Sequence, residues 1–307
     1  MTITAAMVKE LRELTGAGVM ACKNALVETD GNQEEAIEVL RKKGEATAVK
    51  KAGRIAAEGI VYTAVKDGKA AIVEVNSETD FVAKNEKFQT FVANVADQII
   101  DSDAADMDAF MAEPWKLDSS KTVKDELVSQ VAVIGENMNI RRFEKITSDG
   151  VIVSYIHAGG RIGVLVEADA PKEAAVEEAL KNIAMQVAAL SAKFVSQSEI
   201  SEEYKEHERA ILLEQIKNDP KESQKPEKVI NGMIMGRLNK EFKEVCLLDQ
   251  VYVKAEDGKQ SVAKYLEEVS KQVGAEITLK KFVRFETGEG LEKKEENFAE
   301  EVAAQMK

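Results

Sequence analysis

The sequence is poor in the residues that bind metal ions through sulfur or nitrogen: its 307 residues include two cysteines and two histidines. Cys22 and Cys246 lie far apart and form no CxxC pair, whereas a zinc finger needs four ligands at close spacing. Only His157 and His207 could act as catalytic imidazoles, and no serine lies in a GxSxG motif. We therefore expect no metal site, no cofactor and no hydrolase triad.

Aromatic residues make up 5% of the chain, and Trp115 is its one tryptophan. Because sugar-binding clefts are lined by aromatic rings, the many carboxylates do not by themselves indicate a glycosidase. The sequence has no GxxxxGK[ST] phosphate loop and no GxGxxG after a predicted strand, which argues against nucleotide binding by the chain itself. With four prolines, it has no long proline-rich linker.

Long apolar runs are also missing, since no segment approaches about 18 consecutive apolar residues. The first residues, MTITAAMVKELREL, lack the basic start and apolar run of a signal peptide. We therefore expect a soluble, cytoplasmic protein with no membrane partner. The net charge of −13 repels phosphate backbones, which favours a protein partner over nucleic acid.

Helix-forming residues dominate what is present, and the 44% hydrophobic content is enough for a sizeable core. The N-terminal part predicts three short helices, at about 4–15, 19–29 and 32–44, with Gly44 as the end of the third. Such a module resembles the ubiquitin-associated fold. The basic stretch 41–54 is either a solvated linker or helix, or a strip that faces an acidic partner.

A pattern of β-hairpin followed by helix occurs twice. Residues 59–65 and 70–75 flank an Asp-Gly turn and predict a hairpin, followed by a helix at about 81–101. Residues 150–156 and 162–166 flank a turn at 158–160, followed by a helix at about 174–192. The fragments AAIVEV and GVLVEA carry the likeness, which indicates a diverged internal duplication. A helix at about 123–135 connects the two units.

The remaining segments predict a helical arm followed by another globular region. Helices at about 201–217 and from Pro226 to 242, the second with a heptad-like stripe, indicate an antiparallel coiled-coil hairpin. Residues 245–253 and 276–286 look like strands, with a helix at 261–273 between them. A last helix is expected at about 293–305.

These segments together predict an α+β fold with five parts. They are a ubiquitin-associated-like helical module with its linker, the first core subdomain, a second core subdomain in two pieces, the coiled-coil arm and a C-terminal helical module. Their predicted bounds are 1–54, 55–139, 140–199 with 244–288, 200–243 and 289–307.

The segment Ser77-Glu-Thr-Asp-Phe-Val82 links a predicted buried strand to an amphipathic helix. It has two readings. Ser77 and Asp80 fit a capping box, in which case Phe81 would be an ordinary core residue of the first helical turn. Alternatively, the segment is a rigid tip that presents a carboxylate beside a large apolar ring, and the ring anchors in a partner's pocket.

Five blocks of sequence resemble the elongation factor Ts family. They read LRELTGAGVMACKNAL at 11–26, EVNSETDFVAK at 74–84, GENMNIRR at 135–142, His157 followed by GRIGV at 160–164, and VRFETGEG at 283–290. The blocks occur in the order found in the family and span nearly the whole chain.

This resemblance implies a guanine nucleotide exchange factor that does no covalent chemistry. Family members bind elongation factor Tu, a GTPase, and release its GDP. The exchange segment would be Thr79, Asp80, Phe81 and Val82, which would push into the GTPase and disturb its Mg²⁺ and phosphate site. The further contacts that the resemblance implies are Arg12, Val19 and Met20, then His157, then Phe298 and Val302. In the family the arm can mediate self-association, so the complex would be 1:1 or 2:2.

Two alternatives remain open from the residues alone. The chain could be an interaction or chaperone-like module in which Asp80 and Phe81 are only structural. It could also be an acidic hydrolase that uses some of its many carboxylates.

Overall fold

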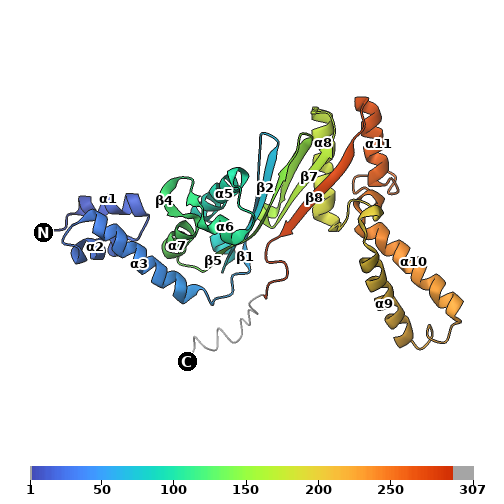
Figure 1. Cartoon of the computed structure of the whole chain (residues 1–307), viewed down its shortest axis with the longest axis horizontal. Coiled ribbons are helices and arrows are strands. Elements are labelled where there is room, and N and C mark those ends of the chain that lie inside the picture. The colour runs from blue at the N-terminus through green and yellow to red at the C-terminus, as the bar shows by residue number, and fades with distance from the viewer. Residues whose placement is uncertain (1, 293–307) are drawn as a thin grey trace.

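A computed structural model of the protein describes residues 2–292 and has an α+β fold. Figure 1 shows a helical module at the N-terminal end, a central body of strands and helices, and a two-helix arm at the opposite end. The predicted C-terminal helix, with Phe298 and Val302, lies outside the described residues. Among residues 2–292, no helix has the length and apolar character needed to cross a bilayer.

The N-terminal module contains α1 (Ala5–Thr15), α2 (Val19–Glu28) and α3 (Gln33–Lys51) around a small apolar cluster. The first two helices were predicted within a residue or two. The predicted end of the third helix at Gly44 is wrong, because α3 continues to Lys51. Gly44 is buried inside the helix, and its Cα faces Ala132 of the body.

The first sheet contains β1 (Glu58–Lys66), β2 (Lys69–Ser77) and β5 (Met138–Thr147), all antiparallel, in the order β1-β2-β5. The predicted hairpin is confirmed, whereas β5 was not predicted. The pairing of β5 with β2 places this strand on the first sheet, although the predicted boundary after residue 139 assigned most of it to the second subdomain. Helices α5 (Glu86–Asp101) and α7 (Val123–Ile134) cover the outer face.

The second sheet contains β6 (Val151–His157), β7 (Ile162–Asp169) and β8 (Thr278–Glu286), also antiparallel. Helix α8 (Ala174–Leu190) covers its outer face, and α11 (Val262–Val273) packs against α8. Both sheets thus contain a hairpin followed by a helix, as predicted.

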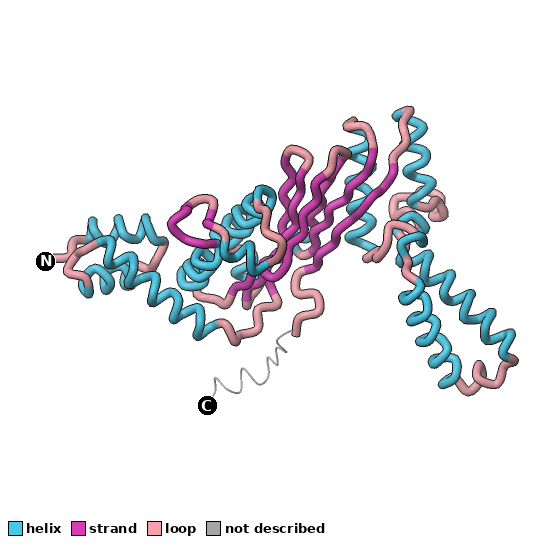
Figure 2. The backbone as a smooth tube through the Cα atoms, in the orientation of Figure 1, coloured by secondary structure: helices cyan, strands magenta, loops and turns pink. Residues whose placement is uncertain are grey.

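The two sheets pack against each other through their inner faces, and the strands lie together in the centre of Figure 2. Side chains alternate along each strand, so one set faces the partner sheet and the other faces the helices. The inner set includes Val61 and Ile72 from the first sheet and Leu165, Val283 and Phe285 from the second. The body is therefore a four-layer arrangement of helices, sheet, sheet and helices.

The arm consists of α9 (Glu202–Asn218) and α10 (Glu227–Val245), which pack side by side through Ile216, Ile234 and Leu238. The coiled-coil-like hairpin was predicted. The strand predicted at 245–253 is wrong, because α10 extends through Val245 and the short 3-10 turn η3 (Leu247–Asp249) follows.

The predicted helix at 81–101 is also wrong in one respect, because it is two helices. A single turn, α4 (Asp80–Ala83), precedes α5, and Asn85 begins the second helix by accepting a hydrogen bond from the Lys87 amide at 2.9 Å. The other short elements were not predicted. They are α6 (Met107–Ala112), β3 (Pro114–Trp115), β4 (Asp118–Thr122), η1 (Ala158–Gly160) and η2 (Gln197–Glu199).

Candidate partner-binding site

The turn that follows β2 is built by short-range hydrogen bonds. Thr79 is the N-cap of α4, and its hydroxyl accepts from the Val82 amide at 3.3 Å. Ser77 is the last residue of β2 and fully buried, and its hydroxyl donates to the Thr79 carbonyl at 3.1 Å. The predicted capping box from Ser77 to Asp80 is therefore wrong, because Ser77 belongs to the strand and the cap lies two residues later.

Phe81 is 81% exposed, the highest exposure of any large apolar side chain in residues 2–292. On the same turn Ala83 is buried, and Val82 packs against the apolar core between the first sheet and helices α5 and α7. Since α4 is a single turn with these two residues facing inward, the preceding residue faces solvent. The reading of Phe81 as a core residue is therefore wrong. An exposed phenylalanine ring offers about 1.5–3 kcal/mol to a partner that buries it.

Asp80 sits beside Phe81 at the start of α4. Its carboxylate accepts from the Lys84 ammonium at 2.6 Å, and both side chains are more than half exposed. This hydrogen bond, together with the positive charge of Lys84, lowers the pKa of Asp80, so the group is ionised at neutral pH. Exposed pairs of this kind are weak, so the carboxylate can exchange Lys84 for another cation at little cost.

Glu136, two residues after the end of α7, stabilises the turn by accepting hydrogen bonds from it. One carboxylate oxygen accepts from the amides of Glu78 and Thr79 at 3.1 and 3.0 Å, and the other accepts from the Thr79 hydroxyl at 2.7 Å. In return, the Glu78 carboxylate accepts from the Asn137 amide at 2.6 Å. Sequence reasoning missed this residue. The available signal was a polar Glu-Asn pair directly after Gly135, which adopts the left-handed conformation that ends α7.

Arg12, Val19 and Met20 lie on the N-terminal module and are all exposed, Val19 at 52% and Met20 at 64%. Leu14, which was not predicted, is exposed to a similar extent at 63%. Two of the predicted apolar side chains come from the start of α2, and the arginine comes from the last turn of α1. We refer to the exposed side chains of Arg12, Val19 and Met20 together as the N-terminal patch.

His157 lies at the end of β6 and is exposed, with its Nδ1 3.0 Å from the Tyr155 hydroxyl. The turn that follows it packs on the first sheet, since a Cβ at Gly160 would approach Ile60 within 2.7 Å. Residue 60 lies two positions from Glu58, which pairs with Ser77. The His157 turn and the Phe81 turn therefore both border the beginning of β1.

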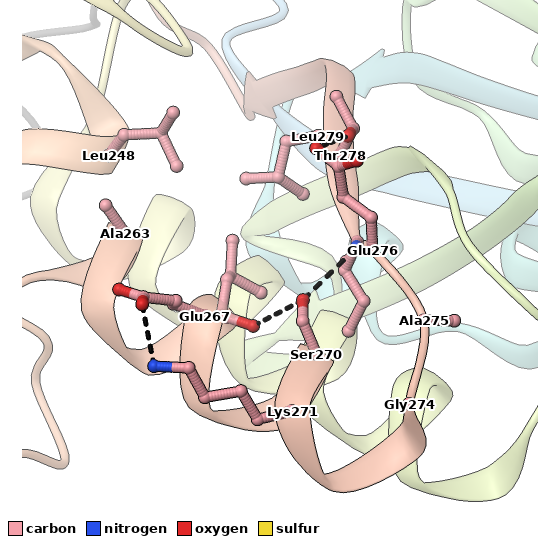
Figure 3. Close-up of a pocket in the computed structure, with 12 residues that line it drawn as sticks. Leu248, Ala263, Glu267, Ser270, Lys271, Gly274, Ala275, Glu276, Thr278 and Leu279 are labelled. Carbon is pink, nitrogen blue, oxygen red and sulfur yellow. Dashed lines mark hydrogen bonds and ion pairs between the residues drawn. The ribbon is translucent and has the colours of Figure 1, made fainter.

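The pocket in Figure 3 lies between α11 and the start of β8, and its polar groups are already paired. The Ser270 hydroxyl donates to the Leu266 carbonyl at 2.8 Å and accepts from the Ile277 amide at 3.1 Å. Within residues 2–292, no three His, Cys, Asp or Glu side chains form a group that could hold a metal ion.

Comparison with known proteins decides which family this arrangement represents. The sequence model of the family described as "Elongation factor TS" matches residues 78–289. The chain is 54% identical to elongation factor Ts of Clostridium novyi, with 99% of each chain covered. It is 53% identical to elongation factor Ts of Clostridium perfringens (98% of each chain) and 49% identical to that of Clostridioides difficile (99% of each chain). The chain belongs to the elongation factor Ts family.

As a member of the elongation factor Ts family, the chain is a translation elongation factor. The matched region begins at Glu78, inside the turn that presents Phe81, and ends at Glu289, just after β8. This membership gives no support to the acidic hydrolase alternative.

Proposed function

We propose that this chain is a guanine nucleotide exchange factor for elongation factor Tu. It binds the GDP-bound GTPase, disturbs the Mg²⁺ and phosphate site and so promotes GDP release and GTP rebinding. The observation that carries the proposal is the 81% exposure of Phe81 on a turn that Glu136 and Thr79 hold in place. The factor does no covalent chemistry of its own.

Phe81 is the anchor in this account. Large aromatic side chains that insert into a partner's pocket dominate the energetics of many interfaces. The ring stands on a single helical turn whose other apolar residues face inward: Ala83 is buried in the core, and the half-buried Val82 packs against it. A tip that does not move can transmit binding energy into the partner, whereas a flexible tip would lose it as ordering entropy.

Asp80 supplies a negative charge beside the anchor. Mg²⁺ in GTPases is bound largely through substrate phosphates and only a few protein ligands, so a new carboxylate nearby can disturb its coordination. The ionised state of Asp80 suits this role, and the exposed Lys84 partner is easily displaced.

Thermodynamic linkage fixes how the factor acts. It must bind the nucleotide-free GTPase more tightly than the GDP-bound form, and the loss of GDP affinity equals the loss of factor affinity. Each tenfold change corresponds to about 1.4 kcal/mol. A shift of roughly 10⁴ therefore requires about 5.5 kcal/mol of differential binding.

The remaining contacts distribute along the chain. The N-terminal module holds the GTP-binding domain of the partner through Arg12, Val19 and Met20, and His157 touches another domain. Phe298 and Val302, outside the described residues, complete the interface. The five-part division, the cytoplasmic location and a 1:1 or 2:2 complex belong to the same proposal, and mass measurement of the mixed complex distinguishes the two assemblies.

The test is the release of fluorescently labelled GDP from elongation factor Tu, with and without this protein. The wild-type chain accelerates release, and both Phe81→Ala and Asp80→Ala slow it by at least tenfold. Because Phe81 is exposed, its removal leaves the melting temperature and the helical circular dichroism unchanged. Absence of acceleration by the wild type would refute the proposal.

A matched control shows that the effect belongs to the turn. Val253→Ala removes an apolar side chain that is 48% exposed and remote from α4, and it leaves GDP release at the wild-type rate. If Phe81→Ala unfolds the protein or Val253→Ala slows exchange equally, the ring is structural and the interaction-module alternative gains support.

A further inference from the structure

Glu136 is a half-buried carboxylate whose acceptor capacity is spent on the turn that carries Phe81. It accepts three hydrogen bonds, from the amides of Glu78 and Thr79 and from the Thr79 hydroxyl, at 2.7–3.1 Å. Two adjacent backbone amides that point at one carboxylate oxygen form a defined local geometry, and charge-assisted hydrogen bonds of this kind are the stronger ones. This side chain therefore acts together with the Thr79 cap and the packing of Val82 and Ala83 to orient α4 and the ring.

The same segment also receives the end of the N-terminal module. The Lys51 ammonium donates to the Gly135 carbonyl, and the Asn137 side-chain amide donates to the Arg54 carbonyl at 2.8 Å. The Arg54 guanidinium lies 3.4 Å from the Glu78 carboxylate. The end of α3, the end of α7 and the start of the Phe81 turn therefore meet at residues 135–137.

Packing along the two helices supports this junction. Helix α3 lies against α7, and at Gly44 the closest approach to the Ala132 side chain is 3.4 Å from an ideal Cβ position. The module that carries Arg12 and Met20 is thus connected to the body through the helix whose C-terminal end precedes Glu136. Packed helices and hydrogen bonds therefore connect the module to the turn.

We propose that Glu136 is a positioning residue for nucleotide exchange: it fixes the Phe81 turn relative to the N-terminal module, so that binding by the module aims the ring at the nucleotide site. This inference rests on the proposed function. Glu136 does not touch the partner in this account, and its effect passes through Thr79 and α4 to Phe81.

Substitution of Glu136 should therefore lower the maximal exchange rate without weakening the binding of the factor to the GTPase. Glu136→Ala leaves the turn's amides without their acceptor and lets α4 change orientation, while the N-terminal patch is untouched. The maximal rate of GDP release at saturating factor falls at least tenfold, and the factor concentration for half-maximal rate changes less than threefold. Glu136→Gln keeps one carbonyl oxygen for the two amides and restores most of the rate.

The closing experiment is a double-mutant cycle on labelled GDP release from elongation factor Tu, with wild type, Glu136→Ala, Phe81→Ala and the double variant. If Glu136 acts chiefly through the ring, its substitution has a much smaller effect once Phe81 is removed, and the effect that remains reflects Asp80 on the same turn. Glu113→Ala is the matched control, because Glu113 is also half-buried and accepts from the Ser102 hydroxyl at 2.7 Å, away from the turn. It leaves the rate unchanged.

The outcomes separate the two proposals. If the wild type does not accelerate release, the proposed function fails. Two results refute the positioning role when the wild type and Phe81→Ala behave as expected. Either Glu136→Ala exchanges at the wild-type rate, or the effect of Glu136→Ala adds fully to that of Phe81→Ala. Should Glu136→Ala fail to fold, Glu136→Asp replaces it, because the shorter side chain withdraws the acceptor from the turn and leaves the Thr79 cap intact. A loss of maximal rate in Glu136→Asp supports the inference, and a wild-type rate overturns it.

Discussion

At the residue scale, the central finding is that Phe81 lies on the surface although its sequence context fits a core position. Helical periodicity from Phe88 onward predicted one continuous amphipathic helix, which would have included Phe81 in its first turn. The structure places a break at Lys84–Asn85, so the two helical segments have independent phases. A single sequence does not encode that break strongly, because asparagine is acceptable both inside a helix and as an N-cap.

At Gly288, the loop after β8 passes very close to Ala57, the residue before β1. The φ of Gly288 is +72°, and a Cβ there would lie 2.2 Å from the Ala57 carbonyl oxygen. Gly290 has the same φ of +72° but nothing nearer than 4.0 Å. Gly290→Ala therefore costs about 1–2 kcal/mol for the left-handed backbone alone.

Gly288→Ala costs the same backbone energy and, in addition, about 1–3 kcal/mol for forcing a methyl group against a carbonyl. Urea unfolding of the two variants measures the difference in free energy of unfolding. Equal losses in the two variants would contradict the proposed close contact.

At the scale of elements, the hairpins were predictable and the strand β5 was not. The Asp67-Gly68 pair between two runs of β-formers is a strong local turn signal. Strand β5 reads MNIRRFEKIT, with charges at several positions and five of its ten side chains half-buried, so no clean alternation marks it. Its place on the sheet is decided by pairing with β2, a long-range interaction that local sequence patterns do not contain.

The exchange segment and the N-terminal patch stay predictions. Of their side chains, those of Asp80, Phe81, Arg12, Val19 and Met20 are exposed, whereas Thr79 and Val82 are half-buried. Glu136 was missed because its role depends on a hydrogen-bonded contact across nearly 60 residues. A carboxylate among 55 acidic residues carries no individual signal.

Gly44 was predicted to end α3 and instead lies in its interior against α7. Gly44→Ala is expected to raise stability by up to about 1 kcal/mol, since alanine is the better helix former and its methyl group meets Ala132 at an ordinary contact distance. Gly44→Leu overpacks the helix contact and costs about 1–3 kcal/mol.

Gly236→Leu provides the control, because Gly236 lies inside α10 with no atom within 4 Å of its Cβ position. It gains helix propensity without a clash. Melting temperatures from thermal unfolding rank the stability of Gly44→Ala, Gly44→Leu and Gly236→Leu. If Gly44→Leu melts no lower than wild type while Gly236→Leu behaves as expected, α3 does not pack closely on α7.

At the scale of the whole molecule, a buried carboxylate connects the two sheets. Glu74 on β2 is fully buried and pairs with Arg141 at 3.0 Å and Arg142 at 2.6 Å, while the Gly288 amide from the loop after β8 donates to it at 2.7 Å. Burial alone would raise the pKa of Glu74, but the hydrogen bonds from Gly288, Asn76 and the two arginines outweigh it and lower the pKa.

The direction of this pKa shift predicts a pH dependence of stability. The pKa of Glu74 in the folded state lies below the ordinary glutamate value of about 4.3. The stabilisation from the ionised carboxylate is therefore complete above that pH and is lost as the pH falls through the folded-state pKa. Glu74→Gln should therefore cost on the order of 3 kcal/mol at pH 7, and the gap to wild type should narrow below about pH 4.

Denaturant unfolding between pH 3 and 7 measures this gap. Glu144→Gln is the control: Glu144 also joins the two sheets, through Lys281 at 2.8 Å, but the pair is exposed and contributes at most about 1 kcal/mol. A gap for Glu74→Gln that stays constant down to pH 3 would show that the carboxylate is not the ionised partner of the two arginines.

The most direct test of the whole account compares two affinities of this chain, for elongation factor Tu without nucleotide and for the same GTPase with GDP and Mg²⁺. Linkage requires the first to be tighter, and the ratio measures the energy available for exchange. Phe81→Ala should reduce that ratio at least tenfold, a loss of about 1.4 kcal/mol or more, chiefly by weakening the nucleotide-free complex. An unchanged ratio in Phe81→Ala would contradict the claim that the exposed ring drives GDP release.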